Sequence, residues 1–253
     1  MLIDAHCHLD FDVFEQDREA MFERAKNNGV EHFIVPATTR KRWPEVLTLG
    51  ERADVSVCLG LHPYFLDEHN DDDIDALEDA LKRNQQVIAV GECGVDARVE
   101  DDRQWALFDA QLKLAKRLDL PVVIHCVHLN DQVAKRLRQL DLPRRGVVHA
   151  YAGSWQQAER FLDLGYVLGV GGPVTHDRAQ KLKGVIEKLP DDGFVFESDA
   201  PDMVPQGVEG RNEPGNMVHV IEEVARLRHA DYATLIANTQ RNIERVFALD
   251  LSQ

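Results

Sequence analysis

The sequence predicts one α/β domain over residues 1–253, a single (β/α)8 TIM barrel with an extra C-terminal helix. Short apolar runs and segments of helical character alternate along the whole chain. Histidines and carboxylates directly follow several of these runs, at the face where the active sites of such barrels form. The length of 253 residues is also the usual size of one complete barrel. No low-complexity linker or break in composition marks a second domain.

The predicted strands are eight short apolar runs rich in β-branched residues. They span residues 1–5, 32–36, 55–61, 87–91, 121–125, 146–149, 165–170 and 193–197. A predicted helix follows each strand, over residues 14–28, 43–53, 73–83, 101–119, 129–140, 154–164, 177–189 and 217–228. A last helical stretch, residues 232–247, is expected to close the bottom or the side of the barrel.

A closed barrel is favoured over an open doubly wound sheet. Eight strand-then-helix units follow one another without a terminal antiparallel run. A dinucleotide-binding sheet would place a glycine-rich turn after its first strand, whereas this chain continues with Ala-His-Cys-His-Leu-Asp. The segment 101–119 also repeats apolar residues at intervals of three and four, which is typical of an amphipathic helix laid on a sheet.

The composition predicts a cytoplasmic globular protein. Apolar residues make up 44% of the chain and charged residues 29%, a balance that argues against disorder. The N-terminus has no basic stretch followed by an apolar one, and no apolar run approaches the roughly 18–20 residues of a membrane span. The four cysteines form no CxxC pair and are expected to be buried free thiols. No membrane contact and no obligate protein partner are implied.

The net charge of −15 restricts the class of substrate. Proteins that hold long nucleic acids usually have a basic surface, because neutralisation of phosphates dominates their affinity. We therefore do not expect this chain to bind an extended duplex over a broad patch. Bound divalent cations would still make one pocket locally positive inside an acidic protein.

Residues of metal-ligand type lie at the ends of the first, fourth, fifth, sixth and eighth predicted strands. The predicted ligands are His6, His8, Glu92, His125, His149 and Asp199. A single histidine at a strand end is more often a hydrogen-bonded rim residue than a ligand. Five strand ends in step with the barrel are a stronger signal, and imidazoles with carboxylates suit a divalent metal such as zinc or manganese. Since six ligands exceed the needs of one tetrahedral ion, two ions bridged by a carboxylate are expected.

Two further residues are candidates for substrate binding. His62, in Gly-Leu-His-Pro after the third strand, is expected to reach the same rim, where it would contact a substrate oxygen or serve a structural role. Arg211 lies in the long segment after the eighth strand, which is placed to fold over the site. It would clamp a phosphate or carboxylate, or else brace its own loop.

Seven segments of the chain carry a resemblance to a known family. They are Asp4-Ala-His6-Cys-His8-Leu, Gly60-Leu-His62-Pro63, Gly91-Glu92-Cys-Gly-Val-Asp96, Pro121-Val-Val-Ile-His125-Cys, Gly146-Val-Val-His149, Glu197-Ser-Asp199-Ala-Pro201 and Arg211-Asn-Glu-Pro214. In this order, and over nearly the whole chain, they resemble the TatD family of metal-dependent hydrolases, within the wider amidohydrolase-like barrel group.

The resemblance implies a two-metal hydrolase. His6, His8 and Asp199 would hold one divalent ion (Zn²⁺, Mn²⁺ or Mg²⁺), and Glu92 would bridge it to a second. The second ion would be held by His125 and His149. Glu92 and Asp199 would be the catalytic residues, with Asp199 as general base toward a metal-bound hydroxide. The family activity, chiefly deoxyribonuclease, implies a DNA end or a small nucleotide-like phosphodiester as substrate.

The chain departs from the family pattern beside the fifth and sixth strands. After His125-Cys126 the family commonly has arginine, whereas this chain has Val127 followed by His128. The family's Phe-Ser-Gly-Ser type loop is replaced here by Tyr151-Ala-Gly-Ser154. Valine cannot imitate the bidentate phosphate contacts of arginine. Hydrolysis of a small lactone, amide or carboxylic ester by the same metal chemistry is therefore the alternative. A non-catalytic metal-binding scaffold is a third reading, disfavoured because a structural site would not need six convergent ligands.

Overall fold

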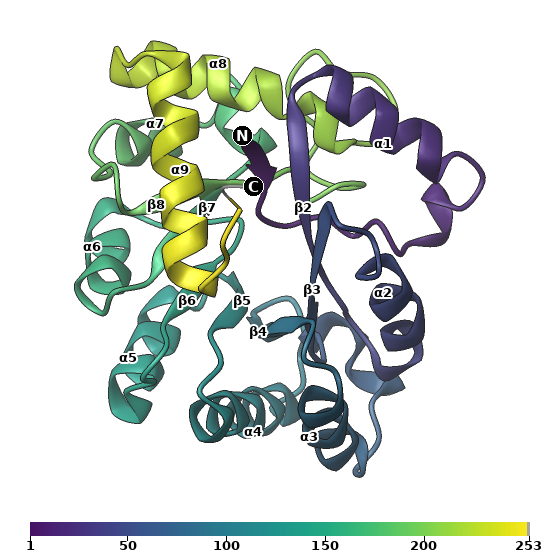
Figure 1. The fold of residues 1–253 in the computed structure, drawn as a ribbon. Helices are drawn as coiled ribbons and strands as arrows, with labels where there is room; N and C mark the ends of the chain where they lie inside the picture. The colour runs from purple at the N-terminus through teal and green to yellow at the C-terminus, as the bar shows by residue number, and fades with distance from the viewer. Residues whose placement is uncertain (252–253) are drawn as a thin grey trace.

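The computed structural model describes residues 1–251, and its centre is a barrel of eight parallel strands (Figure 1). The strands follow one another around the sheet in chain order. Each strand is therefore joined to the next by a crossover connection, as parallel neighbours require. They are β1 (Leu2–Asp4), β2 (Val30–Pro36), β3 (Val55–Leu59), β4 (Val87–Asp96), β5 (Val122–Val127), β6 (Gly146–Val148), β7 (Val167–Val170) and β8 (Phe194–Phe196). The predicted fold class is confirmed.

Helices form the outer layer around the strands (Figure 1). They are α1 (Arg18–Asn27), α2 (Trp43–Leu49), α3 (Asp73–Arg83), α4 (Arg103–Leu118), α5 (Asn130–Leu140), α6 (Trp155–Asp163), α7 (Gln180–Ile186), α8 (Met217–Arg228) and α9 (Tyr232–Phe247). Short 3-10 turns lie in the loops at η1 (Asp12–Phe14), η2 (Arg40–Arg42), η3 (Pro63–Glu68), η4 (Gly172–Thr175) and η5 (Pro214–Asn216). No helix in residues 1–251 has both the length and the apolarity needed to cross a membrane.

The first and last strands meet and bring the two ends of the barrel sheet together. The backbone N–H of Ala5 donates to the carbonyl of Phe196 at 3.0 Å, and that of Asp199 donates to the carbonyl of His6 at 2.9 Å. The buried carboxylate of Asp4 accepts from the backbone N–H of Ser198 at 2.9 Å and from its hydroxyl. The loop after β1 therefore lies directly against the loop after β8, which places His6 beside Asp199.

The barrel interior is a small apolar core to which every strand contributes. Its buried residues from the strands and their ends are Ile3, Ala5, Ile34, Cys58, Ala89, Val123, Val147, Val167 and Val195. Ile243 and Phe247 of α9 pack into the same cluster. Helix α9 lies across the barrel strands in Figure 1 and so closes the end of the barrel, as the sequence predicted. All four cysteines are buried and unpaired.

The predicted fourth strand was five residues too short. It was expected to end at Gly91, but β4 continues to Asp96. The glycines in this stretch resemble a loop in sequence, yet they serve close strand packing: a Cβ on Gly94 would lie 1.9 Å from the carbonyl oxygen of His125 on β5. Glu92 lies two residues before Gly94 and Asp96 two residues after it. Because side chains alternate between the faces of a strand, β4 carries Glu92 and Asp96 on one face.

Candidate metal centre

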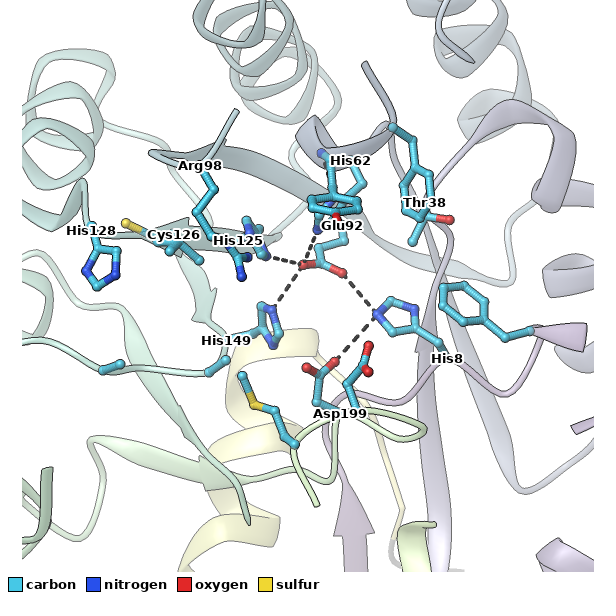
Figure 2. Close-up of a pocket in the computed structure, with 18 of the residues that line it drawn as sticks. His8, Thr38, His62, Glu92, Arg98, His125, Cys126, His128, His149 and Asp199 are labelled. Carbon is cyan, nitrogen blue, oxygen red and sulfur yellow. Dashed lines mark hydrogen bonds and ion pairs between the residues drawn. The ribbon is translucent and has the colours of Figure 1, made fainter. Parts of the chain in front are cut away.

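The six predicted ligands meet at the C-terminal end of the barrel: Figure 2 shows five of them, and the sixth, His6, contacts Glu92 and Asp199. They come from five places in the fold: His6 and His8 follow β1, Glu92 lies in β4, His125 in β5, His149 follows β6 and Asp199 follows β8. His6 is fully buried and the other five are each less than a tenth exposed. Such burial of ionisable side chains needs mutual compensation, because an isolated charge or polar group costs several kcal/mol when it leaves water.

Glu92 lies at the centre of the cluster. Its Oε1 is 3.0 Å from Nε2 of His62, 2.9 Å from Nδ1 of His125 and 3.0 Å from Nε2 of His149. Its Oε2 is 3.2 Å from Nε2 of His6 and 3.3 Å from Nε2 of His8. One carboxylate thus faces imidazoles on both of its oxygens, which is the arrangement expected of a bridging ligand.

The second half of the cluster joins the two histidines after β1 to Asp199. The Nε2 atoms of His6 and His8 are 3.2 Å apart, and Oδ1 of Asp199 lies 3.5 Å and 3.6 Å from them. Ligand atoms lie within 4.8 Å of one another in three groups: His6, His149 and Asp199; His6, His8 and Glu92; and His62, Glu92 and His125. The cluster is therefore able to bind metal.

The polarity of the cluster fits a cation. Buried Oε2 of Glu92 accepts no hydrogen bond, although two imidazole nitrogens face it. Burial alone would raise the pKa of Glu92, but the imidazoles of His62, His149 and His6 outweigh it and hold that pKa well below its usual range. Glu92 is therefore a buried anion. A divalent ion would supply the positive charge that such a carboxylate requires.

Burial lowers the pKa of His6 well below its ordinary value and that of His62 to about 4. At His8 and His149 the neighbouring carboxylates outweigh burial, and they raise the pKa of His8 to about 9 and that of His149 well above its ordinary value. Neutral imidazole is the form that ligates metal, since its ring nitrogen then carries a free lone pair. Burial raises the pKa of Asp199 to about 6, against the opposing influence of His149 and His8.

Carboxylates lie behind two of the histidine rings, within hydrogen-bond distance of His125 and farther from His149. Nε2 of His125 lies 2.9 Å from Oδ2 of Asp96, and Nδ1 of His149 lies 3.6 Å from Oε1 of Glu197. Partners of this kind orient a ligating ring and make its other nitrogen a better ligand. Asp96 belongs to one of the family-like motifs, but no role was predicted for it from the sequence. The missed signal was its spacing of four from Glu92, which places both on one strand face once β4 extends that far.

The loop after β8 is held in an unusual conformation at Asp199. This residue has φ of 53°, in the left-handed region that costs a non-glycine residue roughly 1–2 kcal/mol. The conformation is maintained from both sides: the backbone N–H of Asp202 donates to the carbonyl of Asp199 at 2.8 Å, and Asn212 Nδ2 donates to the carbonyl of Ser198 at 2.8 Å. Backbone strain of this kind is concentrated at functional sites.

The two predicted substrate-binding residues lie in different surroundings. His62 lines the pocket, as expected, and it also belongs to the ligand cluster through its 3.0 Å contact with Glu92. Arg211 lies outside the pocket lining. Its guanidinium contacts Asp17 and Glu213 and lies 4.5 Å from the centroid of the Phe14 ring. These are the contacts of the loop-bracing alternative.

A cavity of about 550 Å³ opens above the cluster, within the usual range for ligand pockets of about 300–1,000 Å³. Val127 and His128 both line it, at the position where the family arginine was expected. The cavity nevertheless holds an arginine that the sequence analysis missed. Arg98 lines the wall with its side chain 61% exposed, while its guanidinium holds Asp96 at 2.6 Å. Tyr64, 62% exposed, also lines the cavity.

Comparison with known proteins agrees with the geometry. The model of the family described as TatD related DNase matches residues 3–248. The chain belongs to the TatD-related DNase family. It is 47% identical over 232 residues to the uncharacterized metal-dependent hydrolase YjjV of Escherichia coli (strain K12), covering 89% of this chain and 90% of that protein. The crystal structure of that TatD homologue has a TM-score of 0.95, with 98% of each chain covered at 43% identity.

A second relative of this TatD-related chain has a named activity. The 3'-5' ssDNA/RNA exonuclease TatD of Rahnella sp. (strain Y9602) is 33% identical over 256 residues, covering 96% of each protein. Family membership and the ligand cluster together establish the chain as a metal-dependent hydrolase of the TatD family.

Proposed function

We propose that this protein hydrolyses phosphodiester bonds in single-stranded DNA or RNA, or in small nucleotide-like diesters, with two divalent ions. The observation that carries the proposal is the pairing of a cluster of metal-ligand type residues on the cavity floor with Arg98 on the cavity wall. Hydrolysis of a phosphodiester needs cations at the reacting phosphate, and a hydrogen-bond donor beside the phosphate can bind its oxygens. Arg98 offers such a donor in a chain whose net charge is −15.

The proposed ligands divide into two sets around Glu92. His6, His8 and Asp199 would hold one ion, and His125 and His149 the second, with Glu92 between them. Zn²⁺, Mn²⁺ and Mg²⁺ are the candidate ions, because mixed imidazole and carboxylate ligands suit several metals. When bound, such ions make water more acidic and stabilise negative charge on the oxygens of the scissile group.

The side chains of the chain would perform the remaining tasks. Asp199, at the mouth of the cluster, would accept a proton from the attacking water at a carboxylate oxygen and return it to the departing oxygen. His62 would hold Oε1 of Glu92 through the 3.0 Å contact, so that the bridging carboxylate keeps its orientation. Arg98 would donate to a non-bridging phosphate oxygen, a contact that the valine at position 127 does not offer.

The relatives support this choice of substrate. Proteins about a third identical to the chain over nearly its whole length are named as exonucleases of single-stranded DNA and RNA. A single strand also suits the acidic surface better than a duplex, because a duplex needs a wide basic patch and a strand end needs only a pocket.

The proposal is tested by a substrate panel on the purified full chain with Zn²⁺, Mn²⁺ or Mg²⁺. The panel contains a single-stranded oligonucleotide, thymidine 5'-(4-nitrophenyl) phosphate, a lactone series and a carboxylic ester. We expect metal-dependent cleavage of both diesters. Lactone or carboxylic ester turnover, with no cleavage of either diester under any of the metals, would instead establish the alternative of a small-ester hydrolase.

A further inference from the structure

The metal cavity is joined to a smaller cavity on the side of β2. This side cavity has a volume of about 190 Å³ and shares three lining residues, Phe11, Thr38 and Phe65, with the main cavity. Figure 2 shows Thr38 beside the site on the flank of His62 and away from His128. Because three residues line both spaces, the two cavities are neighbours with a common border.

The shared border is aromatic. The ring of Phe11 stacks on the metal-site imidazole of His8, with centroids 4.8 Å apart and planes at 13°. The ring of Phe65 lies 5.7 Å from that of His62. Both phenylalanines are only partly buried, so each keeps ring surface for a ligand. Stacking on aromatic side chains is how proteins bind successive bases of a single strand without reading their sequence.

Beyond the aromatic border the side cavity is lined by two cations, Lys41 and Arg42. Lys41 is exposed and makes no ion pair within 4 Å in residues 1–251, although its charge helps to lower the pKa of Asp12. Arg42 is already engaged, because it holds Asp12 at 2.7 Å and lies 5.7 Å from the Phe11 centroid. Glu68 contributes the one carboxylate of the lining. Lys41 is therefore the cation of this lining without a close ion pair, and the one placed to meet a second phosphate.

From this arrangement we infer that the side cavity is a second nucleotide subsite. The main cavity takes the nucleotide that is cleaved, the border of Phe11 and Phe65 stacks a base, and Lys41 binds the neighbouring phosphate of the same strand. The inference rests on the proposed function and adds a preference to it: single-stranded substrates of two or more nucleotides are favoured over a one-nucleotide diester.

The test compares substrate lengths in Lys41 variants. The values of kcat/KM are measured for single-stranded oligonucleotides of two, three and six nucleotides and for thymidine 5'-(4-nitrophenyl) phosphate. The readout is the ratio of the trinucleotide value to the one-nucleotide value. We expect Lys41→Ala to lower this ratio by up to about fivefold, the effect of one exposed charge contact, and Lys41→Arg to restore it. Lys135→Ala on α5 removes an equally exposed lysine outside both cavities and is expected to keep the ratio.

A second readout separates a phosphate contact from a structural effect. Log KM for the trinucleotide is plotted against log salt concentration, and loss of one phosphate contact on a single strand reduces the slope by about 0.7. An unchanged ratio and slope in Lys41→Ala, with diester cleavage intact, would overturn the subsite and leave the proposed function standing. No cleavage of any diester by the wild-type protein would overturn both.

Discussion

Gly169 of β7 and Glu197, which directly follows β8, lie in such close contact that a Cβ on the glycine would lie 2.3 Å from Oε2 of the glutamate. Glu197 is fully buried, its Oε1 accepts the backbone N–H of Ala150, and it lies behind His149 of the metal centre. The missing side chain at position 169 therefore makes room for the carboxylate that lies behind a metal-ligand candidate.

Adding one methyl group at this place should disturb the metal centre without changing a ligand. We expect Gly169→Ala to displace Glu197, release the ring of His149 and weaken the second ion by about 10–100-fold, as for other partners behind a ligand. Metal titration of the apoprotein by calorimetry measures this. Gly184→Ala is the matched control, since a Cβ there meets nothing within 4 Å. Equal metal affinity in Gly169→Ala and the wild type would show that Glu197 does not support the site.

Removing the carboxylate that we propose as general base should separate turnover from metal binding. In Asp199→Asn we expect kcat to fall by about 10²–10⁴-fold, the usual contribution of a general base, with at least one ion retained per chain. Phosphodiester hydrolysis and metal content by mass spectrometry are the measurements. Asp202→Asn, which lines the same cavity outside the ligand groups, is the control. Wild-type turnover in Asp199→Asn would rule out the general-base role.

The arginine on the cavity wall should matter more for an anionic substrate than for a neutral one. We expect Arg98→Ala to raise KM for the nucleotide diester by about tenfold, since a hydrogen bond from a charged donor contributes about 1.5–3 kcal/mol. A neutral carboxylic ester measured beside it should respond less. Arg103→Ala, an exposed arginine paired with Asp101 and Asp67, controls for loss of surface charge. Equal losses on both substrates would point to an effect on Asp96 and the metal instead.

An ion pair on the outer helices should make stability depend on pH. The Oε1 atom of Glu223 lies 2.7 Å from Nζ of the buried Lys183, and hydrogen bonds from Arg226 and Lys183, opposed by burial, lower the pKa of Glu223 to about 2. The folded pKa lies below the unfolded value of about 4.3. The stabilisation is therefore complete above pH 4.3 and is lost as the pH falls toward 2.

The variant Glu223→Gln should accordingly lower the free energy of unfolding by about 2 kcal/mol at pH 7, because it leaves a buried ammonium without its counterion. The difference from the wild type should shrink as the pH is lowered from 4.3 to 3, which urea unfolding at each pH measures. Glu222→Gln, on the exposed side of α8, should have little effect at any pH. A difference that stays constant with pH would contradict the assigned pKa.

Much of the site was predictable because the end of a strand can be recognised in the local sequence, and the fold then brings all strand ends together. In a closed parallel barrel all strands end at one face, so His125 and His149 meet although 23 residues separate them. The position of Asp96 was not predicted, because the glycines before it are typical of a loop. In the barrel these glycines instead allow close packing of neighbouring strands. Arg98 was missed for the same reason, since its position depends on where β4 ends.

The sequence by itself determined the barrel, its closing helix and the set of six ligand-type residues. Alternating apolar runs and polar residues at strand ends can be recognised along the chain without any distance in space. Only the tertiary structure decided how those residues face one another. It placed Glu92 between the histidines, brought His62 into contact with it and turned Arg211 away to brace its own loop. Side-chain direction depends on loop path and on competing partners: Asp17 and Glu213 hold Arg211 in place, and their proximity to it in space is not written in their spacing along the chain.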